Sequence, residues 1–483
     1  MMEINKNTGF NSFDEIDIQC PYCFKKFKHY NVGFRATPIA EETKRKWQNL
    51  YKEKISSDDA EGQKFYQKKL ELAEKFGERK DEVFLDYWRN RGWEASLDQL
   101  YEVGDGYTEF GGSDSARKVS SIQDPVIGIS GDDLIGDKIV DEFGFVTEAI
   151  DIRGEDEGKT SKRVCPYCHN ILPNNYGRNP IKFIAVVGVS GVGKTVMLSK
   201  LLELSEELLR NVEYSVTYVN NYTADSYVKK YKIEQDREMP MGTNKTQFKP
   251  PIFLDVEKNN KLTTFVLYDI AGENCVDAEK IDIIGPFIRN ADGIIMLLDP
   301  EQISSFDLSE RTNNGNITAL KPNAVINAMK SAFLHNTNQK SQIPIAVTFS
   351  KSDLFRIAKV AGENVVRDNS NIFKTLSYKN NAFMIDEFCN VDGEVRQIVH
   401  KYCKELIISL QNTFETYGFF AISTLGHDTE KEGDNKYYLR MNIEQMRLEE
   451  PLMWLMYRWN MINSYTEREK KPAFFKLFGG RKS

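Results

Sequence analysis

The sequence lacks any apolar run of about eighteen residues, the length that a membrane-spanning helix requires. Its first residues are polar, so no secretory signal peptide is visible either. Both absences predict a cytoplasmic protein. An excess of basic residues is also absent, since the formal net charge is -7. The sequence therefore carries no strong nucleic-acid signal, although a local basic surface remains open.

Cysteines are few. Three of the seven, Cys275, Cys389 and Cys403, are scattered, which is not the pattern of a disulfide framework. The others form two identical C-P-Y-C tetrapeptides, typical of the two knuckles of a zinc ribbon, in which four thiolates surround a tetrahedral Zn²⁺. The predicted ligands of one structural zinc ion are Cys20, Cys23, Cys165 and Cys168.

The two pairs are far apart in the chain, so this ribbon must be split by an insertion and close in space. Short strand-like segments precede each pair, at residues 15–19 and 145–152. The alternative is a glutaredoxin-like redox pair, which would need one pair at a helix start inside a βαβ unit. The flanking residues do not suggest such a unit. His169 follows the second pair, but four cysteines complete the metal shell, so we expect His169 to be an ordinary exposed residue.

The insertion, from about residue 40 to residue 104, is dense in charges of both signs and has apolar residues at helical spacing. These features predict a helical hairpin with a solvated charged face. Its apolar stripe comprises Tyr66, Leu70, Ala73 and Phe76, is flanked by Phe65 and Leu72, and continues with Val83, Phe84, Tyr87 and Trp88. Residues 104–144 hold many Gly, Ser and Asp residues and predict a loop-rich stretch.

Residues 188–195, G-V-S-G-V-G-K-T, fit the phosphate-loop pattern G-x-x-x-x-G-K-[ST] and lie between an apolar run and a helical pattern. The glycines let backbone N–H groups turn toward a phosphate, and the helix start adds a partial positive charge. Lys194 can reach the outer phosphates, and the Thr195 hydroxyl can bind Mg²⁺. The predicted phosphate-binding residues are Gly188, Ser190, Gly191, Val192, Gly193, Lys194, Thr195 and Val196.

From residue 181 onward, strands alternate with helical patterns, which predicts an α/β fold with a mainly parallel sheet covered on both faces. The expected strands are 183–187, 251–256, 263–269, 293–299, 343–350 and 418–423. Helices are expected at 386–416 and near 449–461. Ligands of such sheets bind at the carboxyl ends of the strands, where most of the following motifs begin.

The strand at 263–269 ends in the motif D-I-A-G, residues 269–272. The Asp269 carboxylate can hold the Mg²⁺ shell, and the Gly272 N–H can meet a γ-phosphate. D-x-x-G is weak alone. It becomes informative here because it follows a phosphate loop by one strand hairpin.

The strand at 343–350 leads into S-K-S-D, residues 350–353. Asp353 can accept two hydrogen bonds from guanine N1 and N2, which adenine cannot supply, and the Lys351 stem can lie across the base. This motif disfavours an ATPase. After the last strand, backbone N–H groups of a common turn sequence can donate to the base carbonyl. The residues of this turn are Ser423, Thr424 and Leu425.

In this order the motifs resemble the five G-motifs of GTPases in the translation-factor-related (TRAFAC) class, over about residues 181 to 461. The segments 240–243 (P-M-G-T), 298–300 (L-D-P) and 447–454 look like those of bacterial double-GTPase-type proteins, some of which carry a zinc ribbon before the GTPase domain. The resemblance implies that Thr243 is the switch I threonine that closes on Mg²⁺ and the γ-phosphate. Thr246 is the alternative. The implied catalytic residues are Lys194, Thr195, Thr243, Asp269, Gly272 and Glu273.

Two positions in the motifs depart from the pattern of the class. Ser350 stands where Asn or Thr is usual, which puts one base-loop contact in doubt. Glu273 occupies the position at which many members have a water-orienting Gln. A carboxylate beside the γ-phosphate would be repelled unless it is protonated or turned away, so we expect slow intrinsic hydrolysis.

The predicted organisation is a split zinc ribbon with its insertion (1–179), a GTPase domain (180–464) and a basic-aromatic tail (465–483). The tail could dock to an acidic membrane or a partner protein, or be a disordered solubilising end. The predicted function is a switch that binds GTP and GDP, hydrolyses GTP with Mg²⁺ and meets a partner protein through the ribbon and the helical insertion. The alternative is a GTP-binding scaffold with little or no turnover.

Overall fold

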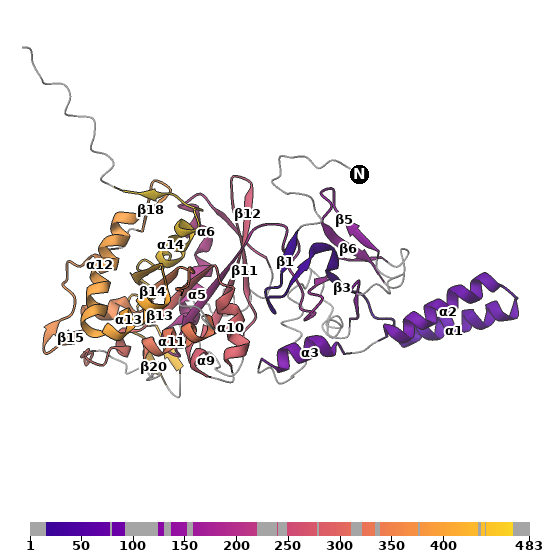
Figure 1. Cartoon of the computed structure of the whole chain (residues 1–483), viewed down its shortest axis with the longest axis horizontal. Helices are drawn as coiled ribbons and strands as arrows, with labels where there is room; N and C mark the ends of the chain where they lie inside the picture. The colour runs from indigo at the N-terminus through magenta and orange to yellow at the C-terminus, as the bar shows by residue number, and fades with distance from the viewer. Residues whose placement is uncertain are drawn as a thin grey trace, which may run out of the picture.

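The structure is a computed structural model. It describes residues 16–77, 80–91, 124–129, 137–151, 158–219, 239, 249–277, 280–310, 321–333, 339–374, 377–432, 436–439 and 441–466. A large α/β domain follows an N-terminal part built from short strands and a helical insertion (Figure 1). Because the chain crosses from one part to the other near residue 180, the phosphate loop lies just inside the α/β domain.

A seven-stranded sheet, ordered β10-β11-β12-β9-β13-β14-β19, forms the centre of the α/β domain. Its strands are β9 (Ile181–Gly188), β10 (Ser215–Tyr218), β11 (Ile252–Lys258), β12 (Lys261–Ala271), β13 (Gly293–Leu298), β14 (Ile345–Phe349) and β19 (Tyr417–Ala421). In the order of the sheet, the strands from β12 to β19 run parallel to one another. Strand β11 is antiparallel to both of its neighbours, β10 and β12. The predicted α/β fold is confirmed, and β10 is an edge strand that the sequence patterns did not indicate.

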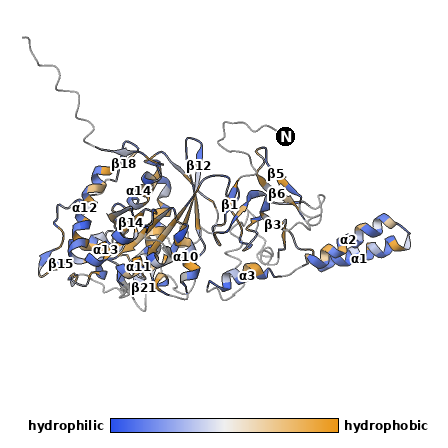
Figure 2. Cartoon of the chain, viewed as in Figure 1, coloured by the Kyte–Doolittle hydropathy of each residue, from blue (hydrophilic) through white to orange (hydrophobic). Residues whose placement is uncertain are grey.

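Every residue of β13 is buried, as expected for a central strand that is covered on both faces. Figure 2 shows the same trend, with hydrophobic strands in the large sheet and hydrophilic residues on its helices. The β11–β12 hairpin turns through Asn259 and Asn260, both in the left-handed region with φ of 52° and 59°. Asparagine tolerates this conformation, which two-residue hairpin loops require.

Helices lie on both faces of the sheet (Figure 1). Among the described residues they are α5 (Lys194–Glu203), α6 (Ser205–Arg210), α9 (Gly272–Val276), α10 (Ile281–Arg289), α11 (Pro322–Phe333), α12 (Ile385–Tyr402), α13 (Lys404–Thr413) and α14 (Glu450–Arg458). Helix α11 packs against both α10 and α13. Helix α12 contacts β19, and α14 contacts β13 and β14. The single helix expected at 386–416 is divided, because Cys403 leaves the helical region with φ of −136°.

Short strands outside the large sheet also belong to the α/β domain. They are β15 (Lys359–Val360), β16 (Glu363–Asn364), β17 (Tyr378–Lys379), β18 (Ala382–Met384), β20 (Glu430–Glu432), β21 (Lys436–Tyr438) and β22 (Ser464–Tyr465). Short 3₁₀ helices η6 (Pro300–Gln302) and η7 (Ser352–Arg356) follow β13 and β14 directly. The ends of these two strands therefore lead into tight turns at the carboxyl edge of the sheet.

Within its described residues, the N-terminal part contains three small antiparallel sheets. Its strands are β1 (Asp17–Gln19), β2 (Lys26–Lys28), β3 (Gly33–Arg35), β4 (Val126–Ile127), β5 (Lys138–Val140), β6 (Val146–Ile150), β7 (Lys159–Thr160) and β8 (Arg163–Val164). Strand β3 pairs with both β4 and β8, so the split ribbon closes in space as expected. Strands β4 and β5 lie in the stretch that was expected to be loop.

The helical insertion consists of a hairpin of α1 (Glu41–Ser56) and α2 (Ala60–Lys75), which projects away from the other elements (Figure 1), and of α3 (Glu82–Arg89). The apolar stripe does not continue from the hairpin into α3 as one surface. Trp88 of α3 is buried against the ribbon, where its ring centroid lies 6.1 Å from that of Tyr22. Val83 is 45% exposed, because it lies on the opposite side of this short helix.

The ribbon packs directly on the α/β domain. The Phe24 ring lies 4.8 Å from the Phe287 ring of α10 and 5.7 Å from the Tyr268 ring of β12, measured between centroids. The Tyr268 hydroxyl donates a 2.8 Å hydrogen bond to the carbonyl of Pro21. The first knuckle thus touches the residue that immediately precedes Asp269. In the described part of the chain, no helix is long and apolar enough to cross a membrane.

Candidate functional site

The phosphate loop joins β9 to α5 in the geometry that the sequence predicts. Gly191 and Gly193 have φ of 89° and 86°, a region that L side chains rarely adopt, and Gly193 caps the start of α5. The Lys194 ammonium turns back over the loop and donates to the carbonyls of Gly188 and Val189, at 3.1 Å for the latter. Lys194 thus lies where a phosphate would meet both the helix start and the ammonium group.

The D-I-A-G motif lies beside this loop because β12 and β9 are neighbouring parallel strands. Their register pairs Ala271 with Gly188. At Gly272 the approach is so close that a Cβ atom would lie 2.9 Å from the Gly188 carbonyl carbon. Glycine is therefore required by space, and this gives Gly272 access to whatever the phosphate loop holds.

Asp269 is a fully buried carboxylate at the end of this strand. Its Oδ2 lies 2.7 Å from the Lys249 ammonium, and its Oδ1 has no hydrogen-bond partner among the described residues. An orphaned buried carboxylate oxygen is costly unless a cation or a donor satisfies it. The Lys249 ammonium lies beside Asp269, a carboxylate that suits Mg²⁺. Thr195, the other proposed ligand that the structure describes, is buried at the start of α5. These residues fit a magnesium site.

Burial lowers the pKa of Lys194, and the carboxylates of Asp269 and Glu273 act in the opposite direction. The ammonium group is therefore held in a partly dehydrated, negatively charged setting. A phosphate would supply more negative charge at the same place. That added negative charge would oppose the effect of burial on the pKa and favour the protonated ammonium form of Lys194.

Glu273 is turned onto the phosphate loop. Its Oε1 accepts a 2.7 Å hydrogen bond from the Ser190 backbone N–H. This N–H is one of those expected to face a phosphate, so the carboxylate occupies an anion-binding position. Repulsion between Glu273 and a γ-phosphate was expected, and this contact places the carboxylate against the phosphate loop.

At the other end of the site, the S-K-S-D motif and the S-T-L turn meet. The Ser423 hydroxyl donates to Asp353 Oδ1 at 2.5 Å, and the Ser352 N–H donates to the Ile422 carbonyl at 2.9 Å. The register of β14 with β19, which pairs Phe349 with Ala421, brings the two turns together. Burial raises the pKa of Asp353, and the Ser423 hydrogen bond opposes this by stabilising the carboxylate.

Ser350, whose departure from the class put one base-loop contact in doubt, contacts the phosphate loop. Its hydroxyl donates 2.6 Å to the carbonyl of Val192 in the phosphate loop and approaches the Leu298 carbonyl at 3.0 Å. The short serine side chain reaches both carbonyls because β9, β13 and β14 are neighbouring strands whose ends meet at this edge of the sheet. The base-side motif is therefore tied to the phosphate loop through this one hydroxyl.

Thr243 and Thr246 are outside the described residues, as is the tail from residue 467 onward. Thr424 is buried next to Ser423, and Leu425 is half-buried. Lys249 lies in no recognisable sequence motif, because its place beside Asp269 depends on how the chain returns to the sheet.

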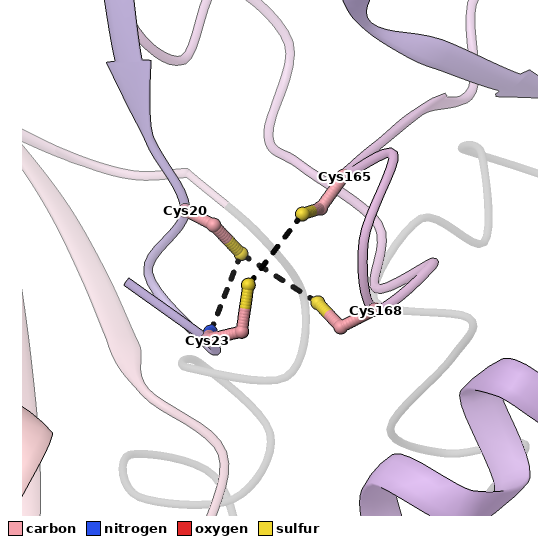
Figure 3. A group of neighbouring side chains, drawn as sticks. All are labelled: Cys20, Cys23, Cys165 and Cys168. Atoms are coloured by element: carbon pink, nitrogen blue, oxygen red, sulfur yellow. Dashed lines mark hydrogen bonds between the residues drawn. The ribbon is translucent and has the colours of Figure 1, made fainter. Parts of the chain in front are cut away.

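The two C-P-Y-C pairs converge, as Figure 3 shows. The Sγ atoms of Cys20 and Cys168 are 3.6 Å apart, and those of Cys23 and Cys165 are 3.7 Å apart. All four Sγ atoms lie within 4.8 Å of one another. This donor set suits a tetrahedral metal ion such as Zn²⁺.

The knuckles are also alike in backbone. Phe24 and His169, which follow the second cysteine of each pair, have φ of 58° and 55°. Each N–H donates 3.0 Å to the carbonyl of the first cysteine of its pair. Neither pair begins a helix, so the arrangement that a glutaredoxin-like pair needs is not found there.

His169 is not an ordinary exposed side chain, contrary to expectation. Its Nδ1 lies 2.9 Å from the carboxylate of Asp81, which also binds the Arg35 guanidinium at 2.9 Å. His169 is 17% exposed and lies outside the four-cysteine group. Asp81 caps α3, so this cluster attaches the helical insertion to the second knuckle.

Fold and site together define a P-loop domain of the GTPase type, joined to a four-cysteine ribbon. Residues 182–410 match the model of the Double-GTPase 2 family, which supports a double-GTPase-type protein. A protein of Mycolicibacterium smegmatis, whose name assigns it to ESX-1 scaffolding and assembly (SaeC), is 23% identical over 321 residues. The aligned region covers 60% of this chain and 78% of that relative.

Proposed function

We propose that the protein is a guanine-nucleotide switch that binds GTP and GDP with Mg²⁺, hydrolyses GTP to GDP and phosphate, and belongs to the TRAFAC class. The observation that carries this proposal is the meeting of Asp353 and Ser423 at the end of β14 and β19, tied to the phosphate loop by Ser350. A buried carboxylate at this place suits the N1 and N2 donors of guanine. The match to a double-GTPase family supports the same class.

In this proposal the chain's own residues have distinct roles. Lys194 neutralises charge on the outer phosphates, and Gly272 donates its N–H to the γ-phosphate. Thr195, Asp269 and the switch I threonine, Thr243 or Thr246, would hold Mg²⁺, which neutralises phosphate charge when bound. Water is the nucleophile, and Glu273 lies beside the position from which this water is expected to attack the γ-phosphate.

The ribbon is proposed to hold Zn²⁺ as a structural ion and to transmit the nucleotide state. The hydrogen bond from Tyr268 to Pro21 supports this role, because Tyr268 precedes Asp269. Phe24 also packs against Phe287 of α10, the second helix after the D-I-A-G motif. Any shift of this region on hydrolysis would therefore move the ribbon contact. The ribbon and the α1–α2 hairpin would then present the change to a partner protein in the cytoplasm, while docking of the tail to a membrane or protein stays a proposal.

A competition experiment tests the base preference. Unlabelled GDP, GTP, ADP and ATP are titrated against fluorescently labelled GDP bound to the purified protein with Mg²⁺. We expect displacement by the guanine nucleotides at concentrations at least about 100-fold lower than by the adenine nucleotides, since a site built for polar groups rejects a base that leaves them unpaired. Equal displacement by ADP and GDP would contradict the guanine assignment.

The variant Asp353→Asn should exchange one base preference for another. The amide N–H can donate to the 2-carbonyl of xanthine, whereas it faces the N2 amine of guanine as a like donor. We expect GDP affinity to fall about 100-fold and xanthosine diphosphate affinity to exceed it. The measurement is the same displacement assay, and Asp307→Asn, which changes an exposed carboxylate, serves as control. Unchanged GDP preference in Asp353→Asn would count against the role of Asp353.

The variant Glu273→Gln should raise the rate of GTP hydrolysis about tenfold or more, equivalent to ~1.4 kcal/mol of barrier. The amide oxygen can still accept from the Ser190 N–H, but the negative charge beside the γ-phosphate is removed. Single-turnover phosphate release measures the rate. Glu363→Gln, which alters an exposed carboxylate of β16, is the matched control. A slower Glu273→Gln variant would instead indicate that the carboxylate assists the attacking water.

A GTP-binding scaffold with little or no turnover is the second candidate. The contact of Glu273 with the phosphate loop favours it, and the name of the SaeC relative refers to scaffolding. No phosphate release over hours, both alone and with a captured partner, would support this candidate over the switch. Release that is slow but complete would support the switch.

A further inference from the structure

Asp299 is a fully buried carboxylate that the roles assigned above do not use. It directly follows β13, and its side chain has 0% exposure. The carboxylate forms an ion pair with the ammonium group of Lys351. A buried carboxylate is strongly disfavoured unless a cation and hydrogen-bond donors compensate it. Lys351 supplies the cation, so the two side chains depend on each other.

The local backbone holds the Asp299 side chain in one place. Its Oδ1 accepts a 2.9 Å hydrogen bond from the Glu301 N–H, and its own N–H donates 3.0 Å to the Gln302 side chain. These reciprocal bonds form a capping box at the start of η6, with Pro300 at its first position. These bonds therefore fix the orientation of the Asp299 carboxylate independently of Lys351.

Lys351 is in turn anchored at both ends. Its backbone forms an antiparallel bridge with Ser423, while its ammonium group meets Asp299 and lies 3.6 Å from Glu301 Oε2. Parallel pairing of Leu298 with Phe349 places the residues after β13 next to those after β14. The stem of Lys351 thus spans from the Asp353–Ser423 contact toward β13.

We propose that Asp299 is a positioning residue of the nucleotide site, which holds Lys351 by its ammonium group so that the aliphatic stem is fixed against the face of the bound base. This inference rests on the proposed guanine-nucleotide function. It assigns Asp299 to affinity and Asp353 to discrimination, because a stem across the base face contacts every purine alike, whereas the Asp353 carboxylate reads the edge. Fixing Lys351 in advance also reduces the conformational entropy that binding would otherwise cost.

The test is the variant Asp299→Asn, which keeps the acceptor for the Glu301 N–H but removes the charge that holds Lys351. Displacement of labelled nucleotide is measured for GDP and for inosine diphosphate, which lacks the N2 amine. We expect both affinities to fall about 10- to 100-fold and their ratio to stay as in the unmodified protein. Asp353→Asn should change that ratio. Asp307→Asn, another carboxylate that caps the turn after it, should change neither value.

A double-variant comparison separates positioning from a general structural role. Lys351→Met keeps an aliphatic stem without the charge, and Asp299→Asn should add no further loss of GDP affinity in the Lys351→Met background. The double variant leaves neither charge buried alone, so it carries the test even where Asp299→Asn by itself unfolds. Equal losses in both backgrounds, or GDP affinity unchanged in Asp299→Asn, would overturn the inference. Absence of GDP binding by the unmodified protein would instead refute the proposed function.

Discussion

The variant Lys194→Ala is expected to bind GDP and GTP at least about 100-fold more weakly than the unmodified protein. Removing a buried charged partner from a phosphate costs several kcal/mol, and each ~1.4 kcal/mol is tenfold in affinity. The side chain is 4% exposed, and its ammonium group is turned toward the loop carbonyls of Gly188 and Val189. Lys249 also acts on Lys194 electrostatically, but its ammonium group pairs with Asp269 at 2.7 Å, so we do not expect it to replace Lys194.

The experiment compares Lys194→Ala with Lys200→Ala, a variant of the same helix. Lys200 has a side-chain exposure of 0% and forms an ion pair with Glu203 at 2.9 Å. Both variants lose a buried ammonium group from α5, so a general effect on stability should affect both. Calorimetric titration with GDP should show lost binding only for Lys194→Ala. Similar weakening in the two variants would mean that helix stability, rather than phosphate contact, sets the affinity.

The variant Cys20→Ser is expected to lose the bound zinc ion entirely and to unfold the ribbon at a much lower temperature. Cys20 has 0% exposure, and its Sγ accepts hydrogen bonds from the Tyr22 and Cys23 N–H groups at 3.4 and 3.5 Å. Structural zinc contributes about 10 kcal/mol or more of apparent binding free energy, which is coupled to folding. The strands of the ribbon are only two to five residues long, so few backbone pairs are left to hold the two knuckles together without the metal.

Metal analysis and the fluorescence of Trp88 measure this outcome. Trp88 is fully buried and its Nε1 donates a 2.9 Å hydrogen bond to Asn170, two residues after Cys168. We expect about one zinc ion per unmodified chain and none in Cys20→Ser or Cys165→Ser. Cys403→Ser is the control, since this half-buried thiol lies outside the cluster and burial raises its pKa to about 11. Retention of half the zinc in Cys165→Ser would contradict a single shared site.

The two sites are close enough to influence each other. Tyr268 contacts the first knuckle through Pro21 and is followed by Asp269. Its ring also lies 4.8 Å from that of Phe287 in α10, measured between centroids. Zinc loss would therefore release a contact next to the proposed magnesium ligand. By linkage, any effect of the metal on nucleotide affinity must be matched by an equal effect of the nucleotide on metal affinity.

Much of the α/β domain could be predicted from local pattern. The expected strand at 293–299 agrees with β13 to one residue, because continuous apolar sequence between polar turns leaves few alternatives. The division of the expected helix at Cys403 could not be predicted, since it depends on a backbone conformation rather than on periodicity. Val83 followed the helical spacing yet is exposed, because α3 packs on the ribbon instead of extending the hairpin.

For the proposed site, the sequence by itself selected the candidate residues: the phosphate loop, Asp269, Asp353 and the four cysteines. These residues lie in short motifs whose spacing follows from local backbone geometry. Only the tertiary structure decided how they act on one another. It put Lys249 on Asp269, Glu273 on the Ser190 N–H and Asp299 on Lys351. Such contacts join strands and loops that are distant in sequence, and the register of parallel strands creates them only once the sheet has formed.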